Sequence, residues 1–538
     1  MADLGQSNSP PVRQVNWPAP VQIHLRASRE ILRNFLKICG NSLEPRGRPS
    51  MTPSEPAVGT VGAFESLKVP PRNPAAGATG EIQEFLATNR YFTVVLDDDP
   101  TGSQAVHGID VVLIPEAGEV VRALREGNGS CFVLTNTRSL PEGEAIELTS
   151  NLVRNILELL REDNVVVRFV SRSDSTLRGH VIAEIAVLEK AQVQSTGQGF
   201  QAILFAPAFI EAARMTAGDT HWAKVSGEMR PVAETEYSKD SSFGYANSDL
   251  RDFLEEKSKG SIKSADVASL SLEVIRLGGP DAVAEILLGV PAGSWVIVNA
   301  IDYSDLEIVA LGVTRAERLG GTFVFRSGPS FVKPLLGIET VPPVTKEVIW
   351  AGLPPRPDTN SRGLVMVGSH TALSTSQMDS LLNNRSVNHL VVDVAQLLVN
   401  GAGRLEYVNE VAKQAIESLR ENITLISTSR TVVPGADIAE NLDIARSVSA
   451  GMSHILQLIA AHFPEWVIAK GGITSHDLAV HGLGFTRARV LGQSYPGNIS
   501  VFRPLVASSD CQSIPYIVFP GNVGDENTLT RAVEILEG

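Results

Sequence analysis

One local pattern recurs along most of the chain: a short β-branched apolar run ends in a polar turn, and a helical pattern follows. This alternation is typical of parallel α/β units, in which each strand leads into a helix that crosses back over the sheet. In the first half the apolar runs are 93–96, 131–134, 165–170, 203–205, 295–298 and 322–325. In the second half they are 364–367, 389–392, 423–426, 466–468 and 516–519. The sequence therefore predicts an α/β protein built on mainly parallel sheets.

The segment 341–362 interrupts this pattern, because it carries five prolines and neither helical nor strand periodicity. A boundary between domains is expected in such a segment. We therefore predict a linker at 341–362 between two α/β domains, 66–340 and 363–538. Each is expected to hold a mainly parallel sheet flanked by helices, with the active site in the cleft between the two domains.

Residues 1–65 differ from the rest of the chain. They contain two proline-rich patches, and between these lies the segment 21–39, which has four lysine or arginine residues and a single acid. We predict a disordered extension with a transient amphipathic helix. The alternative is a mitochondrial transit peptide, which also combines arginines with few acids.

Charge and cysteine usage narrow the class of protein. The 538 residues include 60 acids and 46 lysines or arginines, which gives a formal net charge of −14. Such a chain repels nucleic acid and anionic membranes, so we expect neither as a partner. The three cysteines are far apart and form no CxxC pair, which argues against a disulfide framework or a zinc ribbon. We expect a soluble, cytoplasmic protein whose partners are small molecules, and the sequence leaves a homo-oligomer open.

The turns after the apolar runs are the places to search for a site, because open parallel sheets bind ligands beyond the carboxyl ends of their strands. The first turn is DDDPTG at 97–102. Three adjacent carboxylates repel one another, and such a run usually lies in solvent. Directly behind a buried strand they could instead serve as a general base, as magnesium ligands or as acceptors for sugar hydroxyls.

The next turns of the first half are rich in arginine and hydroxyl side chains. TNTRS follows the second run, and SRSDSTLRGH follows the third and leads into a helix that we expect to end near residue 190. Arginines and hydroxyls near a helix N-terminus suit a carboxylate or a phosphate, and ordinary helix capping is the alternative. After the fourth run, APAFIEAAR adds two further candidates. The candidate ligands of these turns are Arg138, Arg172, Asp174, Ser175, Thr176, Arg178, Glu211 and Arg214.

A polar segment, 216–263, follows without a buried apolar run. We expect a long excursion with a helix near 248–256. Long loops of this kind form rims or lids of sites, and a plain surface insertion is the alternative.

The second half has three turns of a different character, each rich in glycine and hydroxyl residues. They are GSHTALSTSQ after residue 367, AKGGITSHD after 468 and PGNVGDENT after 519. Glycine lets backbone N–H groups approach an anion, so three such turns in one domain predict a phosphate-binding edge, with ordinary α/β turns as the alternative. The sequence has no GxxxxGK[ST] and no GxGxxG, which argues against the common nucleotide-binding loops.

With these motifs the chain resembles the four-carbon acid sugar kinases, ATP-dependent enzymes that phosphorylate acids such as 3-oxo-tetronate, threonate and erythronate. The resemblance covers about residues 66 to 538. LDDDPTGSQAVHGI, TNTRS, SRSDSTLRGH and FAPAFIEAARMTAGDTHW are similar to the acid-sugar-binding domain of that family. VGSHTALS, AKGGITS and FPGNVGDENTL are similar to its nucleotide-binding domain.

The resemblance implies a kinase that uses ATP and Mg²⁺ to phosphorylate the terminal hydroxyl of a four-carbon sugar acid. It implies that Asp98 and Asp99 face the acid together with most of the arginines and hydroxyls named above, and we expect one of the two carboxylates to accept the hydroxyl proton. The residues expected at ATP are Ser369, Gly471, Gly472, Ile473, Thr474, Gly521 and Asn522. Because Ile473 follows the glycine pair where an acid could bind metal, the metal ligands stay unassigned.

Two alternatives remain. Asp97, Asp99 and Thr101 also satisfy the DxDxT pattern of haloacid-dehalogenase-like phosphatases, and Thr135 could supply the second motif of that class. That chemistry further needs an acidic pair after a later strand, which the runs from 170 to 298 lack. The second alternative is a sugar-acid-binding protein without catalytic activity, which nucleotide turnover would distinguish from a kinase.

Overall fold

The computed structural model describes residues 63–99, 102–103, 105–354, 362–399, 401–430, 438–495, 499–508 and 511–537, without the side chains of 438–442. The chain divides into two units, 1–58 and 59–538, and all described residues belong to the second. The segment 21–39, for which a helix or a transit peptide is predicted, lies outside the described residues. In the described part of the chain, no helix is long and apolar enough to cross a membrane.

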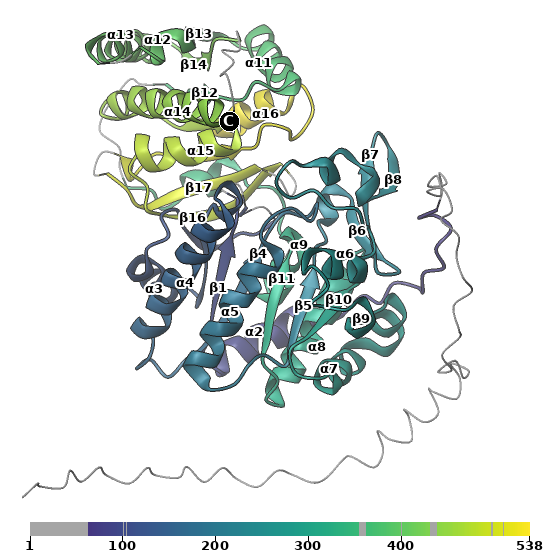
Figure 1. The fold of residues 1–538 in the computed structure, drawn as a ribbon. Helices are drawn as coiled ribbons and strands as arrows, with labels where there is room; N and C mark the ends of the chain where they lie inside the picture. The colour runs from purple at the N-terminus through teal and green to yellow at the C-terminus, as the bar shows by residue number, and fades with distance from the viewer. Residues whose placement is uncertain are drawn as a thin grey trace, which may run out of the picture. The chain divides into compact units, whose positions relative to one another are not determined.

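Fifteen strands of the described residues form one sheet, in the order β13-β14-β12-β15-β18-β17-β16-β2-β3-β1-β4-β11-β5-β10-β9 (Figure 1). The N-terminal half supplies β1 (Tyr91–Asp97), β2 (Ile109–Val112), β3 (Ser130–Leu134), β4 (Val166–Arg172), β5 (Ala202–Ala206), β9 (Ala268–Leu270), β10 (Ser294–Val298) and β11 (Phe323–Ser327). The C-terminal half supplies β12 (Leu364–Val367), β13 (Val387–Val392), β14 (Ile423–Thr428), β15 (Val467–Lys470), β16 (Arg487–Tyr495), β17 (Ile499–Val506) and β18 (Tyr516–Phe519).

All eleven apolar runs that the sequence predicts as strands are strands, and wherever two of them are neighbours they run parallel. The predicted α/β fold class is therefore confirmed. β18 also pairs antiparallel with β17. One feature was not expected: β16 pairs antiparallel with both β17 and β2, so that the strands of the two halves belong to a single sheet. In the register of the second pair, Ala488 lies opposite Val111 and Arg489 opposite Asp110.

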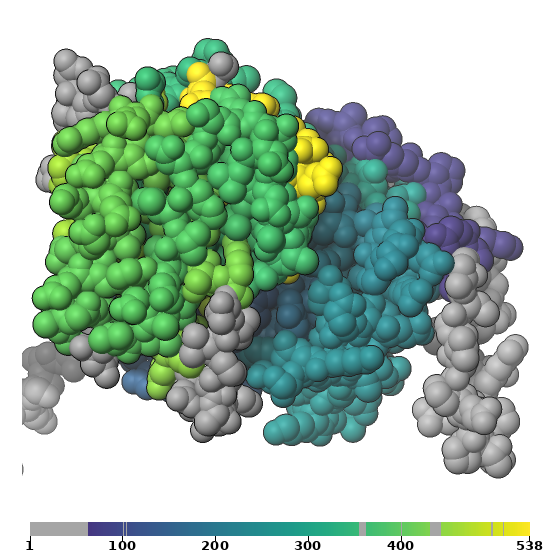
Figure 2. All heavy atoms as spheres, turned by 90° about the horizontal axis from the view of Figure 1, so that it is seen from above, coloured from purple at the N-terminus to yellow at the C-terminus, as the bar shows by residue number. Residues whose placement is uncertain are grey.

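Helices cover both faces of the sheet. Those of the N-terminal half are α2 (Ala78–Thr88), α3 (Ala117–Glu126), α4 (Glu142–Leu159), α5 (Val181–Thr196), α7 (Gly279–Gly289), α8 (Tyr303–Arg318) and α9 (Pro329–Leu335). Those that follow are α10 (Lys346–Trp350), α11 (Ala372–Asn384), α12 (Val394–Leu397), α13 (Ala402–Leu419), α14 (Ile438–Ala460), α15 (Gly472–Asp477) and α16 (Thr528–Glu537). In Figure 2, green residues of the C-terminal half lie beside teal residues of the N-terminal half.

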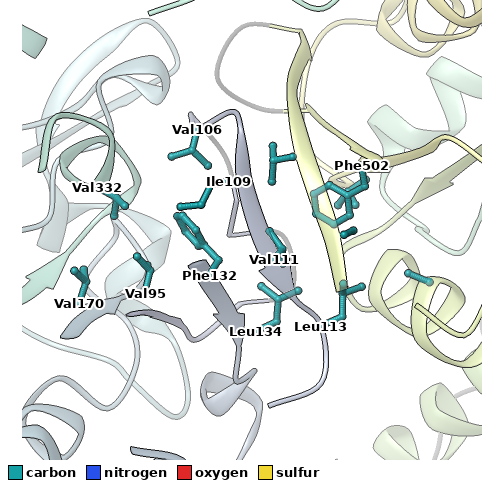
Figure 3. Close-up of a cluster of buried hydrophobic side chains, with 14 of the residues drawn as sticks. Val95, Val106, Ile109, Val111, Leu113, Phe132, Leu134, Val170, Val332 and Phe502 are labelled. Carbon is teal, nitrogen blue, oxygen red and sulfur yellow. The ribbon is translucent and has the colours of Figure 1, made fainter. Parts of the chain in front are cut away.

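The side chains of β1 show how the two faces form. Because successive residues of a strand point to opposite faces, Val94 and Leu96 pack with α3, α4 and α5, whereas Val95 packs in the core that also contains residues of α2, α8 and α9. This second core continues into the C-terminal half. Figure 3 shows Val95 and Phe132 of the N-terminal strands in the same cluster as Phe502 of β17. The two halves therefore share hydrophobic core as well as sheet.

The polar segment 216–263 contains more regular structure than the sequence indicates. Strands β6 (Arg214–Ala217), β7 (Thr220–Val225) and β8 (Glu228–Pro231) form a separate antiparallel sheet. The expected helix near 248–256 is α6 (Leu250–Lys257), which begins after Asp249, whose carboxylate accepts two backbone N–H bonds. The strands of this small sheet are partly exposed, so they have no continuous apolar run from which the sequence could have predicted them.

The described residues begin at residue 63, three positions before the start at residue 66 that the sequence predicts for the first domain. Phe64 packs edge-on against Trp222 of β7, with ring centroids 5.5 Å apart. Leu67 and Val69 join the same apolar cluster, which also contains Leu272. This short segment is therefore packed on the fold.

Candidate active site

In each half, successive strands are added first to one side of the first strand and then to its other side. Turns that carry the motifs lie at the point where this order of addition reverses. After β1 the chain adds β2 and β3 on one side, and then crosses to place β4 on the other side of β1. After β12 it adds β13 and β14 on one side, and then places β15 on the other. Ligands bind at such switch points, because the following helices diverge to opposite faces and leave a crevice.

The turns from both switch points line one cavity of about 570 Å³. From the N-terminal half it takes Asp99, Asn136, Arg138, Ser139, Arg172, Asp174, Ser175, Arg178, Phe209, Ala212, Arg214 and Pro329. From the C-terminal half it takes Gly472, Ile473, Pro520, Gly521, Asn522, Val523 and Gly524. One surface is thus rich in arginine and the other rich in glycine. Eleven of the seventeen candidates lie in this lining, and the exceptions are Asp98, Thr176, Glu211, Ser369, Gly471 and Thr474.

The three adjacent carboxylates after β1 have different environments. Asp97 is fully buried, and its Oδ1 accepts hydrogen bonds from Arg172 Nη1 at 2.8 Å and from the backbone N–H of Asp99 at 3.1 Å. Its other oxygen lies against the backbone of Gly102, where an added Cβ would come within 1.6 Å of it. Only Asp99 reaches the cavity, where it forms an ion pair with Arg138.

Asp98 is buried behind the turn that follows β4. Neither of its carboxylate oxygens has a hydrogen-bond partner in the described part of the chain, and one of them lies beside Gly179, where a Cβ would approach it to 2.8 Å. Burial raises the pKa of Asp98 to about 7, and burial likewise raises that of Asp97 to about 6 although Arg172 opposes it. Both carboxylates thus resist ionisation more than an exposed carboxylate does.

Asp174 organises the arginines of the acid-binding side. Its Oδ2 accepts hydrogen bonds from Arg178 Nε at 2.6 Å and from the hydroxyl of Thr176, and its Oδ1 lies 3.7 Å from Arg138 Nη1. Burial opposes the charge on Asp174, but the guanidinium groups of Arg138 and Arg178 outweigh burial and hold its pKa well below the usual range. Asp174 therefore stays ionised and fixes two arginines at the cavity wall.

Arg214 differs from the other arginines of the lining. Within the described residues it forms no ion pair with a carboxylate; its Nη1 donates to Ser175 Oγ at 2.8 Å, and its guanidinium lies over the ring of Tyr237 at 5.1 Å. Arg138, Arg172 and Arg178 each have a carboxylate partner. The positive charge of Arg214 is thus the least compensated in the cavity.

The small antiparallel sheet holds the turn that carries Ser175. His221 of β7 is fully buried, with Nε2 at 2.7 Å from the carbonyl oxygen of Ser175 and Nδ1 at 2.9 Å from Thr216 Oγ1. Tyr245 donates its hydroxyl to the carbonyl oxygen of Thr176 at 2.8 Å. The polar segment is therefore a support for the wall of the cavity. No periodicity in the sequence could have shown this role, because it depends on contacts between distant segments.

Glu211 is not part of the cavity lining. Tyr303 donates to its Oε1 at 2.5 Å, and Ser330 donates to its Oε2 at 2.8 Å. Ser330 also accepts a hydrogen bond from the backbone N–H of Ile210. The carboxylate thus braces the turn that carries Phe209 and Ala212, and its predicted contact with substrate stays a prediction.

The three glycine-rich turns meet because β12, β15 and β18 are neighbouring parallel strands. Ser374 Oγ donates to Ser369 Oγ at 2.9 Å and lies 3.1 Å from the carbonyl oxygen of Gly521, so it links the first turn to the third. Thr474 fills the space beside the second: a Cβ on Gly471 would lie 3.0 Å from its hydroxyl. Gly471 has a φ of +127°, which favours glycine.

The sequence motifs did not identify Lys470 as a candidate site residue. Lys470, the last residue of β15, is fully buried, and its Nζ lies 3.2 Å from the carbonyl oxygen of Pro520 and 3.4 Å from that of Gly521. Burial lowers its pKa to about 7. In the sequence, the lysine of AKGG looks like an ordinary polar residue at the end of a strand. Only its burial beneath the third turn indicates a functional role.

Comparison with known proteins finds a different domain family in each half of the chain. Residues 93–335 match the family described as a sugar-binding N-terminal domain, and residues 364–529 match the one described as a nucleotide-binding C-terminal domain. A D-erythronate kinase from Heliobacterium modesticaldum is 25% identical over 380 residues, which are 68% of this chain and 77% of that protein.

Two solved structures share the fold. One is a protein from Salmonella typhimurium LT2 described as a tRNA synthase, 18% identical, with a TM-score of 0.61 over 82% of this chain and 98% of the other. The second, from Haemophilus influenzae, is 18% identical, with a TM-score of 0.56 over 82% of this chain and 100% of the other. These likenesses establish the fold alone. With a sugar-binding domain followed by a nucleotide-binding domain and a kinase among its relatives, the chain belongs to the four-carbon acid sugar kinase family.

Proposed function

We propose that this protein is an ATP-dependent kinase that phosphorylates the terminal hydroxyl of a four-carbon sugar acid. The observation that carries the proposal is the single cavity with an arginine-rich wall from the turns after β1, β3 and β4 and a glycine-rich wall from the turns after β15 and β18. The first wall suits a small carboxylate and the second suits phosphates. Phosphoryl transfer requires both ligands in one space.

The residues present fit the nucleotide and its metal. Glycines let the backbone of the C-terminal turns approach a polyphosphate closely. Within the described residues, no group of three or more His, Cys, Asp or Glu side chains could hold a metal ion by itself. Mg²⁺ in kinases is held by one or two carboxylates together with the phosphates, and Asp99 and Asp174 are the carboxylates of the lining. When bound, Mg²⁺ neutralises charge on the phosphates.

Asp99 is the better candidate for contact with the reacting hydroxyl. It lines the cavity, whereas Asp98 is buried behind the turn after β4. In phosphoryl transfer the aspartate mainly orients the hydroxyl and receives its proton late, so that an ion-paired carboxylate is basic enough. In this proposal Asp97 and Asp98 are buried residues that support the turn after β1, and they do not contact the substrate.

Arg214 and Ser175 would anchor the carboxylate of the acid. The charge of Arg214 is uncompensated by a carboxylate in the described residues, and Ser175 Oγ lies within 2.8 Å of its Nη1. Arg138 and Arg178 then place further positive charge along the same wall. Four arginines against two carboxylates give the lining a net positive charge, which favours a substrate that is itself an anion.

The geometry of the site argues against the phosphatase alternative, because the aspartate that would serve as its nucleophile does not reach the cavity. A haloacid-dehalogenase-like enzyme would need Asp97 to attack the substrate, but Asp97 is fully buried, bound to Arg172 and absent from the lining of the cavity. An inactive sugar-acid-binding protein differs from the kinase only in turnover.

A screen for ADP release tests the proposal. The protein is incubated with Mg-ATP and with each four-carbon sugar acid and its oxo form, and the Gly471→Val variant serves as the matched control because a branched side chain at its φ of +127° disrupts the nucleotide turn. Acid-dependent ADP release by the unaltered protein, absent in the variant, supports a kinase. Folded protein without turnover on any acid overturns it, and phosphate release from sugar phosphates without ATP favours the phosphatase.

A further inference from the structure

The side chain of Lys470 lies directly beneath the third glycine-rich turn. Its Nζ contacts two successive carbonyl oxygens, those of Pro520 and Gly521, and sits 4.0 Å from the ring centroid of Phe519. In the described part of the chain, no carboxylate lies within 4 Å of this ammonium group, although the residue is fully buried. A buried charge without a counter-ion is costly, and an ammonium group carries donors only, so its position demands acceptors.

These contacts fix the direction of two peptide planes. The carbonyl oxygen of Gly521 also lies within hydrogen-bond distance of Thr371 Oγ1, at 3.2 Å, and of Ser374 Oγ, at 3.1 Å. In a trans peptide the C=O and the following N–H point in opposite directions. With both carbonyls turned toward Lys470, the N–H groups of Gly521 and Asn522 therefore point away from it.

Gly521 and Asn522 are residues of the cavity lining. Among the described residues, neither of their backbone N–H groups has an acceptor. Two successive N–H groups that point the same way form a site for an anion. The buried ammonium group behind them adds positive potential to that site.

We infer that Lys470 is a positioning residue for the nucleotide: it holds the peptides 520–522 with their N–H groups turned toward a phosphate in the cavity, and that phosphate is its missing counter-charge. The inference rests on the proposed kinase function for the identity of the anion. The geometry itself requires only a polyphosphate.

A pH dependence follows. Because burial lowers the pKa of Lys470 to about 7, the unliganded protein loses this charge as the pH rises above 7. A bound phosphate favours the protonated form and raises that pKa, so affinity must fall with rising pH between the two values, by up to about tenfold per pH unit.

The groups beside these turns whose pKa is shifted do not change charge between pH 6.5 and 9. Asp98 of the N-terminal half, whose pKa burial raises to about 7, does change charge in this range, and the ratio between variants cancels its contribution. Burial lowers the pKa values of His370, after β12, and of His476, on α15, so both are already neutral. The hydrogen bond from Arg531 lowers the pKa of Asp525, after β18, so it is already ionised. Arg430, after β14, donates to the carbonyl oxygen of Ser369 and remains charged.

Calorimetric titration of the full chain with Mg-ADP and with inorganic tripolyphosphate, from pH 6.5 to 9, tests the inference without requiring turnover. The unaltered protein should bind both more weakly as the pH rises. Lys470→Met should bind both at least about tenfold more weakly at pH 6.5 and show no such pH dependence. Lys470→Arg, which keeps a permanent charge, should restore part of the affinity and remove the pH dependence. Ratios between variants at each pH cancel the titration of the ligands themselves.

Lys333→Met is the matched control. Lys333 on α9 is also nearly buried with a pKa lowered by burial, and its Nζ lies 4.3 Å from the ring centroid of Tyr303. Its substitution removes a similar buried ammonium group that has no contact with the third turn among the described residues, so affinity for Mg-ADP should stay unchanged. If both Lys470 variants fail to fold, the pH dependence of the unaltered protein decides: constant affinity from pH 6.5 to 9 overturns the inference.

The outcomes separate this inference from the kinase proposal. Phosphorylation of an acid by the unaltered protein, with unchanged Mg-ADP affinity in Lys470→Met, overturns the role of Lys470 and leaves the kinase. Loss of Mg-ADP and tripolyphosphate binding in Lys470→Met, with no acid phosphorylated by the unaltered protein, supports the role of Lys470 and overturns the kinase. Binding of neither ligand by the unaltered protein overturns both.

Discussion

Three adjacent carboxylates after β1 show how strongly the position of a single residue decides its chemistry. Asp97 is held by Arg172 inside the sheet, Asp98 is buried with a raised pKa, and Asp99 lies at the cavity. The run DDD is symmetrical in sequence, so sequence reasoning left the choice between Asp98 and Asp99 open. Burial breaks this symmetry, and burial depends on which way the turn leaves the strand.

Asp99→Asn tests the assignment. The substitution keeps volume but removes the proton acceptor, so we expect kcat to fall by about a hundredfold or more, with the affinity for ATP retained. Steady-state kinetics and calorimetry with Mg-ADP provide the two measurements. Asp98→Asn is the matched variant, and a larger loss of kcat there than in Asp99→Asn would contradict the assignment.

Arg214→Gln tests the anchor for the carboxylate of the acid. A charge-assisted contact contributes on the order of 1.5 to 3 kcal/mol, so KM for the acid should rise by roughly 10- to 150-fold while KM for ATP stays the same. Arg230→Gln is the control, because that arginine lies on exposed β8 and pairs with Glu228. Equal effects of the two substitutions on KM for the acid would show that Arg214 does not contact it.

Individual side-chain roles could be predicted from the sequence only where a motif places a residue directly at a strand end. Asp99, Arg138 and Gly521 lie at the cavity for this reason. Glu211 lies in a motif too, but its carboxylate accepts hydrogen bonds from Tyr303 and Ser330, which are far along the chain, and it is not part of the cavity lining. Contacts of that kind are set by tertiary packing and leave no trace in local sequence.

At the scale of elements, the small sheet β6–β8 is the support that the cavity wall depends on. His221 contributes through a buried, neutral ring. Burial lowers the pKa of His221 to about 4, below its ordinary value of 6.5. Between these two pH values His221 is protonated in the unfolded chain but neutral in the folded protein. The free energy of unfolding therefore decreases as the pH falls from about 6.5 toward 4.

His221→Gln removes this pH dependence. Linkage gives about 1.4 kcal/mol per pH unit in that window, so the free energy of unfolding of the unaltered protein should fall by about 2 kcal/mol more than that of the variant between pH 7.5 and 5. Urea unfolding at the two pH values measures both. Parallel losses in the two proteins would mean that His221 is not the buried neutral group described here.

Most of the strands that are buried on both faces were predictable. Ten of the eleven predicted strands have continuous apolar runs because they are buried under helices on both faces, and the eleventh, the edge strand β13, is largely exposed. β16 was missed because its buried and partly exposed residues alternate, with irregular register at Gly492. β17 was missed because Arg503 and Pro504 interrupt its apolar run. β9 was missed because it has only three residues, and β2 was missed because Asp110 interrupts its short apolar run. The join between the two halves depends on these missed strands.

For the whole molecule, the described part of the chain begins at residue 63. Composition predicts that residues 1–65 add little to the fold, whereas Phe64 of this segment, with Leu67 and Val69 just after it, packs against Trp222 and its neighbours. Removing residues 1–62 should leave turnover and Tm nearly unchanged. Removing residues 1–69 should lower Tm by several degrees, because each buried apolar side chain contributes on the order of 1.5 to 3 kcal/mol.

Calorimetry on the two truncated proteins measures the difference. A loss of Tm on removing residues 1–62 as large as that on removing residues 1–69 would show that the first segment is itself part of the folded unit. Mitochondrial import with cleavage in that segment would favour the transit-peptide alternative.

If one cavity brings a sugar acid and ATP together, the γ-phosphoryl group must pass directly from ATP to the acid. Its path can be followed with ATP that carries a radioactive γ-phosphate, in the presence of Mg²⁺ and erythronate, threonate or 3-oxo-tetronate. Direct transfer should move the label to one of these acids in equal amount to the ADP formed, with little transfer in Asp99→Asn and none in Gly471→Val. Label released only as inorganic phosphate, whether or not an acid is present, or label that stays on ATP with every acid, would contradict it.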